Sequence, residues 1–326
     1  MRVLVCGGAG YLGSVLVRKL LEAEIDVAVF DNFSTGHRQA LNPGVKVIEG
    51  NLLSKEEVFN AVNSQNFHAV VHAACLSDEK SAYENPYLSL NYNYISTLNI
   101  LEAMKLVGVK KLVLASSSSI YGVVDSNPVR EESRMVISGP FGESFYSMEK
   151  LLGWYEFIAQ IKSVSLRMAD LAGATIDGNL GEDKGENAGV VSQAVKASLG
   201  DCVYRLNGNN YQTLDGTLVR DYLHVDDAAF AIVKALEFLN TGNRSDVFNI
   251  SCGRQYSVKE IVAEVEDQSG KKLNIVPSVR KRGDKDVIYM DISKALRDLQ
   301  YAPAFELPDM VQSSMYWFAR YPKGFA

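Results

Sequence analysis

The sequence predicts an α/β fold in which a doubly wound parallel sheet forms one domain and a smaller, mixed α/β domain forms the other. Apolar runs rich in β-branched residues alternate with helical patterns over the first 120 residues. A glycine-rich turn joins the first of these runs to the first helical pattern. The length of 326 residues is about twice the ~150 residues of a typical domain. These observations favour two domains with right-handed crossovers in the first.

Five strands and three helices are expected in the first 120 residues. The apolar runs predict strands at residues 2–6, 26–30, 45–49, 68–73 and 111–115. The amphipathic patterns between them predict helices at residues 12–23, 55–63 and 88–107. Because strands and helices alternate, the strands are expected to be parallel and covered on both faces.

The second half of the chain is less regular. A helix at 145–160 and a strand at 163–168 are followed by a glycine-rich loop at 173–189 and a helix at 190–199. We expect a helix at 222–238, a strand at 247–251 and a helix opened by Ser257. The domain with the parallel sheet is then discontinuous, with residues 1–169 plus 221–251, and residues 170–220 plus 252–326 form the smaller domain.

The composition excludes several classes of protein. Hydrophobic residues make up 47% and charged residues 22%, which is typical of an ordered globular chain. The net charge of −6 and the lack of a long basic run argue against a nucleic-acid partner. No apolar run approaches the ~20 residues of a membrane span, and no leader is expected before Arg2. Four scattered cysteines predict reduced thiols in a cytoplasmic protein: Cys6, Cys75, Cys202 and Cys252.

The first strand is followed by a turn that is typical of dinucleotide binding. It reads Gly7-Gly8-Ala9-Gly10-Tyr11-Leu12-Gly13 and opens a helix, whose N-terminus can hold a pyrophosphate. A turn needed only for packing would have the same composition. However, Asp31 ends the next strand about 20 residues later, where a carboxylate can bind a ribose hydroxyl. This pattern indicates a Rossmann domain and favours NAD over NADP, whose 2′-phosphate the carboxylate would repel.

A possible acid–base pair follows in the 145–160 helix. Tyr146 and Lys150 are four residues apart, so they share a helix face, and the lysine charge favours the phenolate. Such a pair also occurs by chance on helix surfaces. Four serines at the end of the fifth strand, residues 116–119, supply hydroxyls at the edge where ligands of such folds bind. One of them can polarise a substrate oxygen beside Tyr146.

Together these motifs resemble the extended short-chain dehydrogenase/reductase family, and within it the nucleotide-sugar 4-epimerases. The matches run along the chain in the same order as in the family. Besides the glycine turn, they are Asp31 to Gly36, Val71 to Ala74, Asn93 with Thr97, the serines with Tyr121-Gly122, Tyr146 with Lys150, Gly181 to Asp183, Val219 to Val225, Gly283-Asp284 and Asp291 to Lys294. The resemblance implies NAD-dependent epimerisation at C4 of a nucleotide-linked sugar, of the UDP-glucose/UDP-galactose type, through a 4-keto intermediate. It also implies a homodimer and NAD that stays bound through turnover.

The resemblance assigns a role to each matched position. Tyr146 would take the proton of the sugar 4-hydroxyl, Lys150 would hold the nicotinamide ribose, and Ser117, or Ser118 as second choice, would bind the same sugar oxygen. The implied cofactor contacts, besides Tyr146 and Lys150, are Gly7, Gly10, Tyr11, Leu12, Gly13, Asp31, Asn32, Asn51, Leu52, Ala73, Ala74 and Asn93. The implied substrate contacts are Ser117, Ser118, Tyr146, Asp170, Asn187, Arg220, Lys281 and Asp284. No metal site is expected, and His72 and His224 are interpreted as structural.

Five positions depart from the family pattern. Phe145 and Ser147 flank Tyr146, where the family has Pro-Tyr-Gly. Asp170 replaces an asparagine that faces the substrate, and Lys281 replaces an arginine that clamps the diphosphate. Ile288 replaces a bulky tyrosine, which leaves room for an N-acetylated sugar.

Other reactions within the family remain open. A 4,6-dehydratase is disfavoured because Ser118 and Ser119 stand where its relatives have Asp-Glu, and Asp31 argues against an NADP-dependent 4-keto reductase. A uronate epimerase or decarboxylase differs only in the charges of the pocket. A non-catalytic NAD-binding scaffold is the remaining alternative, and we disfavour it because such proteins often lose the Tyr/Lys pair.

Overall fold

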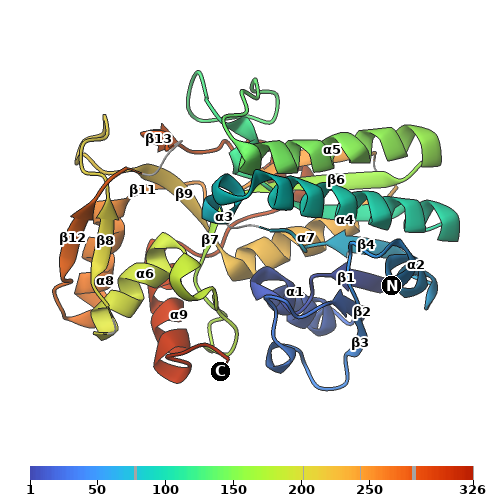
Figure 1. The fold of residues 1–326 in the computed structure, drawn as a ribbon, viewed down its shortest axis with the longest axis horizontal. Helices are drawn as coiled ribbons and strands as arrows, with labels where there is room; N and C mark the ends of the chain where they lie inside the picture. Colours follow the sequence, from blue (N-terminus) through green and yellow to red (C-terminus); the bar gives the residue numbers. More distant parts are fainter. Residues whose placement is uncertain (77–78, 201, 243, 281–283, 326) are drawn as a thin grey trace.

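A seven-stranded parallel sheet forms the larger part of the molecule (Figure 1). The computed structural model describes residues 1–76, 79–200, 202–242, 244–280 and 284–325. The strand order is β10-β6-β5-β4-β1-β2-β3. The strands are β1 (Arg2–Cys6), β2 (Asp26–Asp31), β3 (Lys46–Glu49), β4 (Ala69–His72), β5 (Lys111–Ser117), β6 (Lys162–Met168) and β10 (Asp246–Ile250). The predicted doubly wound sheet is confirmed, and the order reverses between β1 and β4, where such folds bind ligands.

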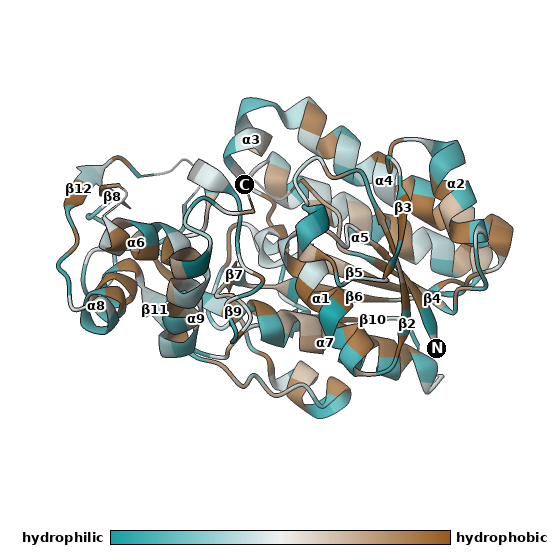
Figure 2. Cartoon of the chain, turned by 90° about the horizontal axis from the view of Figure 1, so that it is seen from below, coloured by the Kyte–Doolittle hydropathy of each residue, from teal (hydrophilic) through white to brown (hydrophobic). Residues whose placement is uncertain are grey.

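Helices cover both faces of this sheet. Alternate residues of β1 point to opposite sides, so that Val3 and Val5 join one apolar core and Leu4 and Cys6 another. The first core is covered by α1 (Tyr11–Glu22) and α7 (Val225–Asn240). The second is covered by α2 (Lys55–Asn63), α4 (Pro86–Val107) and α5 (Pro140–Ala159), and the strands between these layers are apolar in Figure 2.

A smaller domain lies beyond the carboxyl edge of the large sheet (Figure 1). One of its sheets contains β7 (Asp170–Ala172), β9 (Val219–His224), β11 (Gln255–Ser257) and β13 (Val287–Ile288), and a second pairs β8 (Tyr204–Asn207) with β12 (Ile275–Ser278). Its helices α6 (Val190–Leu199), α8 (Val258–Ser269) and α9 (Leu307–Arg320) share a third apolar core. The remaining short helices are α3 (Glu79–Glu84), η1 (Arg38–Ala40), η2 (Ser118–Tyr121), η3 (Gly185–Asn187) and η4 (Ala295–Leu299).

Two predicted helices begin three or more residues away from their expected first residue. The helix expected at 222–238 begins only at Val225, because Nδ1 of His224 accepts a hydrogen bond from the backbone N–H of Asp226 and caps it. The residues before this helix belong to β9, which pairs within the smaller domain. By contrast, α7 packs against the large sheet and β10 is one of its strands. The helix expected at 145–160 begins five residues earlier, at Pro140, a residue favoured in the first helical turn. The exact division into domains stays a prediction.

No helix among the described residues combines the length and the apolar character that crossing a bilayer requires.

Candidate active site

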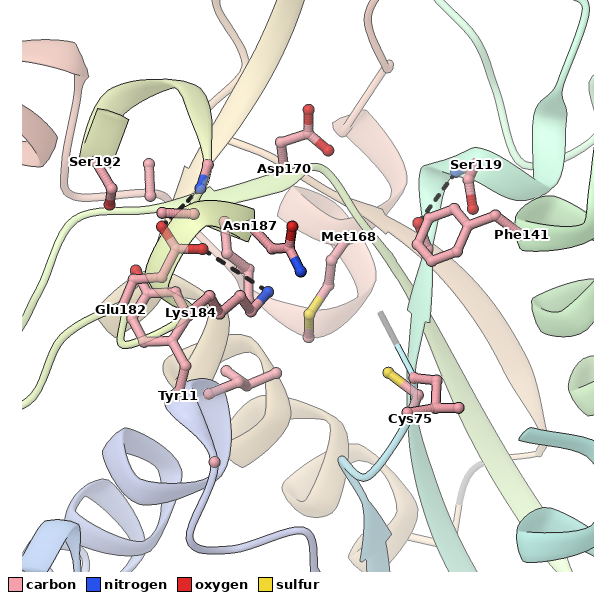
Figure 3. Close-up of a pocket in the computed structure, with 18 of the residues that line it drawn as sticks. Tyr11, Cys75, Ser119, Phe141, Met168, Asp170, Glu182, Lys184, Asn187 and Ser192 are labelled. Carbon is pink, nitrogen blue, oxygen red and sulfur yellow. Dashed lines mark hydrogen bonds and ion pairs between the residues drawn. The ribbon is translucent and has the colours of Figure 1, made fainter. Parts of the chain in front are cut away.

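A cavity of about 970 Å³ lies between the two domains (Figure 3). Its wall on the larger domain follows the carboxyl ends of the strands, from Gly7 after β1 to Met168 at the end of β6. Its wall on the smaller domain includes Arg220 of β9 and Ile288 of β13. The cavity therefore joins the glycine turn to the expected substrate residues in one continuous space.

The glycine turn has the close contacts of a dinucleotide-binding turn. Gly7 has φ +83°, and a Cβ there would lie 2.6 Å from the backbone nitrogen of Ala74. A Cβ on Gly13 would lie 1.9 Å from the carbonyl oxygen of Gly7, so α1 can approach the turn only with glycine at that position. Gly10 caps α1 without a side-chain acceptor, and no acidic residue lies in the first turn. The N-terminus of α1 is thus open to an anion on the cavity wall.

Asp31 joins this turn to the end of β2. Its carboxylate accepts hydrogen bonds from the backbone N–H groups of Ala9 at 2.9 Å and Phe33 at 2.8 Å. The carboxylate is held on the cavity wall, with acceptor sites left for a ribose hydroxyl. The other predicted cofactor residues on this wall are Gly7, Gly10, Tyr11, Leu12, Gly13, Asn32, Ala73 and Ala74.

Besides Tyr146 and Lys150, three predicted cofactor residues lie outside this wall. Leu52 lines a small second cavity beside Asp31. Asn51 lines neither cavity, and its side chain accepts a hydrogen bond from the N–H of Leu53. Asn93 is completely buried. Its amide accepts from the N–H of Leu76 at 2.8 Å and donates to Oγ of Ser144 at 3.0 Å. Asn93 therefore braces the segment after β4 against α5 and lies outside the cavity wall. Its contact with the cofactor stays a prediction.

The serines of residues 116–119 reach the wall as expected. Oγ of Ser117 accepts a hydrogen bond from the N–H of Ser119 at 3.2 Å, which leaves its proton available for a ligand oxygen. Ser118 lies beside it on the wall, and Oγ of Ser119 is buried without a partner. Ser116 instead donates to Glu149.

The structure does not bring Tyr146 and Lys150 to the cavity. Neither of these described residues lies on its wall; α5 presents Phe141 and Phe145 there instead. The two phenylalanine rings meet edge to face, with centroids 5.3 Å apart. The expectation that Tyr146 and Lys150 contact the sugar and the nicotinamide ribose is therefore corrected: the residues four apart on the cavity face of α5 are both phenylalanine.

Glu149 fixes this orientation of α5. Its carboxylate accepts hydrogen bonds from the hydroxyls of Ser116 at 2.8 Å and Ser165 at 2.7 Å, and pairs with Nη2 of Arg167 at 2.7 Å. Residues four and eight apart share a helix face, so Phe145 and Phe141 lie on the same face of α5 as Glu149. This face points toward the sheet, because Glu149 bonds to residues of the strands.

Tyr146 and Lys150 consequently lie on a different side of α5. Tyr146 packs against the apolar core that contains Ile120 and Tyr121. Nζ of Lys150, an exposed residue, lies 5.0 Å from the centroid of the Tyr146 ring. The pair therefore forms a cation–π contact outside the cavity wall.

The smaller domain supplies most of the expected substrate residues. Arg220, Asp170, Asn187 and Asp284 all lie on the cavity wall, as does Ile288. Nη1 of Arg220 donates to the carbonyl oxygens of Val219 at 2.9 Å and Lys285 at 2.8 Å, which orients the guanidinium. Asp284 accepts a hydrogen bond from the hydroxyl of Tyr211 at 2.7 Å. Lys281 lies outside the described residues.

Several buried groups around the cavity have shifted pKa values. Burial, reinforced by the charge of Asp170, raises the pKa of Asp221 to about 7. Burial raises the pKa of Tyr92 to about 12 and that of the Cys75 thiol to about 11. Burial lowers the pKa of His72 to about 3, so this histidine is neutral and bonded to Thr97. Within the described residues, no group of three or more His, Cys, Asp and Glu could hold a metal ion.

A motif in the sequence indicates the phenylalanine pair, although it was not among the predicted site residues. Pro140-Phe141-Gly142 supplies the proline and glycine expected around the tyrosine, with phenylalanine between them. Phe145 then takes the place of the lysine, four residues later. Glu149 and Arg167, which hold the helix in this orientation, carried no motif that identified them as partners.

The comparisons with known proteins agree with the fold and the cavity. The model of the NAD dependent epimerase/dehydratase family matches residues 3–251. The UDP-glucose 4-epimerase of Lactobacillus helveticus is 34% identical over 100% of this chain and 99% of its own length, and that of Bacillus subtilis (strain 168) is 34% identical over 97% and 96%. The crystal structure of the Bifidobacterium longum enzyme in complex with NAD+ and UDP is 30% identical, with a TM-score of 0.94 over all of both chains.

These findings confirm the predicted resemblance and fold. They support NAD as the cofactor and epimerisation at C4 of a nucleotide sugar as the chemistry of the relatives. The chain belongs to the NAD-dependent epimerase/dehydratase family.

Proposed function

We propose that this cavity holds NAD and a UDP-linked hexose together, as an NAD-dependent nucleotide-sugar 4-epimerase requires. The observation that carries the proposal is the continuity of the cavity from the glycine turn to Arg220 and Asp284. A dinucleotide on the first wall and a nucleotide sugar on the second would meet beside Ser117. The named relatives that share this fold along the whole chain act on UDP-glucose.

The residues present fit NAD. The N-terminus of α1 would hold the pyrophosphate, and the Asp31 carboxylate would bind a ribose hydroxyl and repel the 2′-phosphate of NADP. Ala73, Ala74 and Leu52 would line the dinucleotide. When bound, NAD supplies the acceptor and donor of hydride for oxidation and reduction at C4 of the sugar.

Arg220 is our candidate for binding the diphosphate of the sugar nucleotide, because it lies on the wall and its guanidinium is already oriented by two carbonyl oxygens. Arg280 is engaged elsewhere, with Asp286 at 2.5 Å and over the ring of Tyr211. Ile288 leaves more room than a tyrosine at the sugar end, so we include N-acetylated hexoses among the substrates. The charge of Asp170 disfavours a uronate, whose carboxylate it would repel.

The test uses purified protein and has two binding readouts. NAD released by denaturation should approach one equivalent per chain, and titration calorimetry should detect UDP and UDP-glucose. Arg220→Gln should weaken UDP binding and leave the NAD content unchanged, whereas Arg254, an exposed residue of the same domain outside the cavity wall, provides the control variant Arg254→Gln. Protein that contains no NAD and does not bind UDP would refute the proposal.

The second candidate is a protein that binds both ligands with little turnover. The observation that favours it is the position of Tyr146 and Lys150 away from the cavity. NMR of a panel of UDP, GDP, dTDP and CDP sugars incubated with the protein separates the two candidates and identifies the reaction.

We also propose that the protein is a cytoplasmic homodimer that pairs through α5. Trp154, Phe157 and Ile158 of this helix are 57%, 89% and 56% exposed, although they are large and apolar. Tyr155 between them is buried. The described cysteines are all free thiols, which suits a reducing compartment. Light scattering should give twice the mass of one chain.

A further inference from the structure

We propose that Phe141 and Phe145 occupy the two positions on α5 from which a proton-transferring pair would act, so that the wild-type protein holds NAD and the nucleotide sugar with slow turnover at C4. This inference rests on the proposed function, because it concerns the same cavity and the same ligands.

The first argument is the location of the two residues. Phe141 and Phe145 lie on the cavity wall with Ser117 and Ser118. The start of α5 touches the serine segment directly, since a Cβ on Gly142 would lie 2.5 Å from the carbonyl oxygen of Ser119. The side chains at 141 and 145 are therefore those that α5 offers to a sugar oxygen bound at Ser117.

The second argument is chemical. Oxidation at C4 breaks the C–H bond, whose hydride goes to the nicotinamide, and the O–H bond, whose proton goes to a base. A phenylalanine ring has no atom that accepts this proton. The serine hydroxyls can donate to or align the oxygen but are not bases at neutral pH. Tyr92 and Cys75 on the wall have pKa values raised by burial to about 12 and about 11, so both are protonated at neutral pH.

The third argument is that α5 cannot readily turn to present Tyr146. Successive helix residues are about 100° apart, so placing Tyr146 where Phe145 lies requires a rotation of about that size. Such a rotation would separate Glu149 from Arg167, whose side chains are only 11% and 5% exposed. Tyr146 would also leave the apolar core around Ile120 and Tyr121.

The decisive experiment introduces the missing groups. The double variant Phe141→Tyr/Phe145→Lys places a phenol and an ammonium on the cavity face of α5. Because acid–base catalysis typically contributes about 10² to 10⁴ in rate, we expect this variant to interconvert UDP-glucose and UDP-galactose at least ~100-fold faster than wild type. NMR of the sugar nucleotides measures both rates.

Matched variants and binding readouts complete the test. Tyr146→Phe and Lys150→Ala should leave the wild-type rate, the NAD content and the affinity for UDP unchanged. Because Phe145 is buried and a lysine there can impair folding, Phe141→Tyr alone serves as a second variant, which adds only a hydroxyl and should also exceed wild type. Its NAD content and UDP affinity should equal those of wild type.

Two results would overturn the inference, and a third would refute the proposed function. The inference is overturned if wild type turns over as fast as both variants, or if Tyr146→Phe abolishes a rapid wild-type reaction. Wild-type protein that contains no NAD and does not bind UDP refutes the proposed function instead, because the inference assumes that both ligands are held.

Discussion

Replacing Glu149 by glutamine should destabilise the protein by about 3 to 5 kcal/mol, the cost of removing one partner of a buried ion pair. Glu149 and Arg167 are 11% and 5% exposed, and the carboxylate accepts two serine hydroxyls in addition to the guanidinium. Glutamine has nearly the same shape but no charge, and its amide N–H₂ cannot accept these bonds. The guanidinium would be left buried without a counter-charge.

Urea unfolding followed by circular dichroism measures this loss as a lower midpoint. Glu156→Gln is the matched control, because Glu156 is an exposed residue of the same helix. A change at the surface away from such features typically costs within about 0.5 kcal/mol. A loss below about 1 kcal/mol for Glu149→Gln, or one equal to that of the control, would refute the argument that this ion pair holds the orientation of α5.

The remaining predictions concern the cofactor, the sugar, the dimer and pH. The wild-type Kd for NAD should be at least tenfold lower than the Kd for NADP, and Asp31→Asn should reduce this preference. Equal wild-type affinities for NAD and NADP would contradict the role of the carboxylate. Ile288→Tyr should weaken binding of UDP-N-acetylglucosamine more than that of UDP-glucose in calorimetry, and unchanged relative affinities would remove Ile288 from the sugar site. Phe157→Glu should yield monomers in light scattering, whereas an unchanged mass would exclude α5 as the interface. Burial raises the pKa of Asp221 to about 7, so its protonated form is favoured in the folded state. The contribution of Asp221 to the free energy of unfolding is therefore fully present below about pH 4 and is lost as the pH rises through 7. Asp221→Asn should therefore lose less stability than wild type between pH 5 and pH 8 in urea unfolding, and equal losses would contradict the shifted pKa.

The large sheet could be predicted because its signals are local. Residues 2–6 and 55–63 carry periodic apolar patterns long enough to define an element, and the structure has β1 and α2 with those bounds. The strands of the smaller domain were not predicted. β13 has two residues, and its partner β9 lies more than sixty residues earlier in the chain. Such short strands depend on distant pairing and not on their own sequence pattern.

The glycine turn was predicted for the same reason, since its conformation and its ligand depend on adjacent residues. The face of α5 was not, because the spacing of Tyr146 and Lys150 places them on one side of a helix without saying which side meets the cavity. That choice depends on Arg167, which lies on the neighbouring strand β6 and pairs with Glu149. The buried position of Asn93 was not predicted either, because its partners Leu76 and Ser144 are distant in sequence.

A crystal structure of the wild-type protein with NAD and UDP-glucose tests the central claim most directly. The account predicts a dinucleotide over the glycine turn, a diphosphate at Arg220, and C4 of the sugar beside Ser117 and Phe141. The hydroxyl of Tyr146 should remain outside the cavity. A hydrogen bond between Tyr146 and the 4-hydroxyl of the sugar, or a sugar bound away from Phe141, would contradict it.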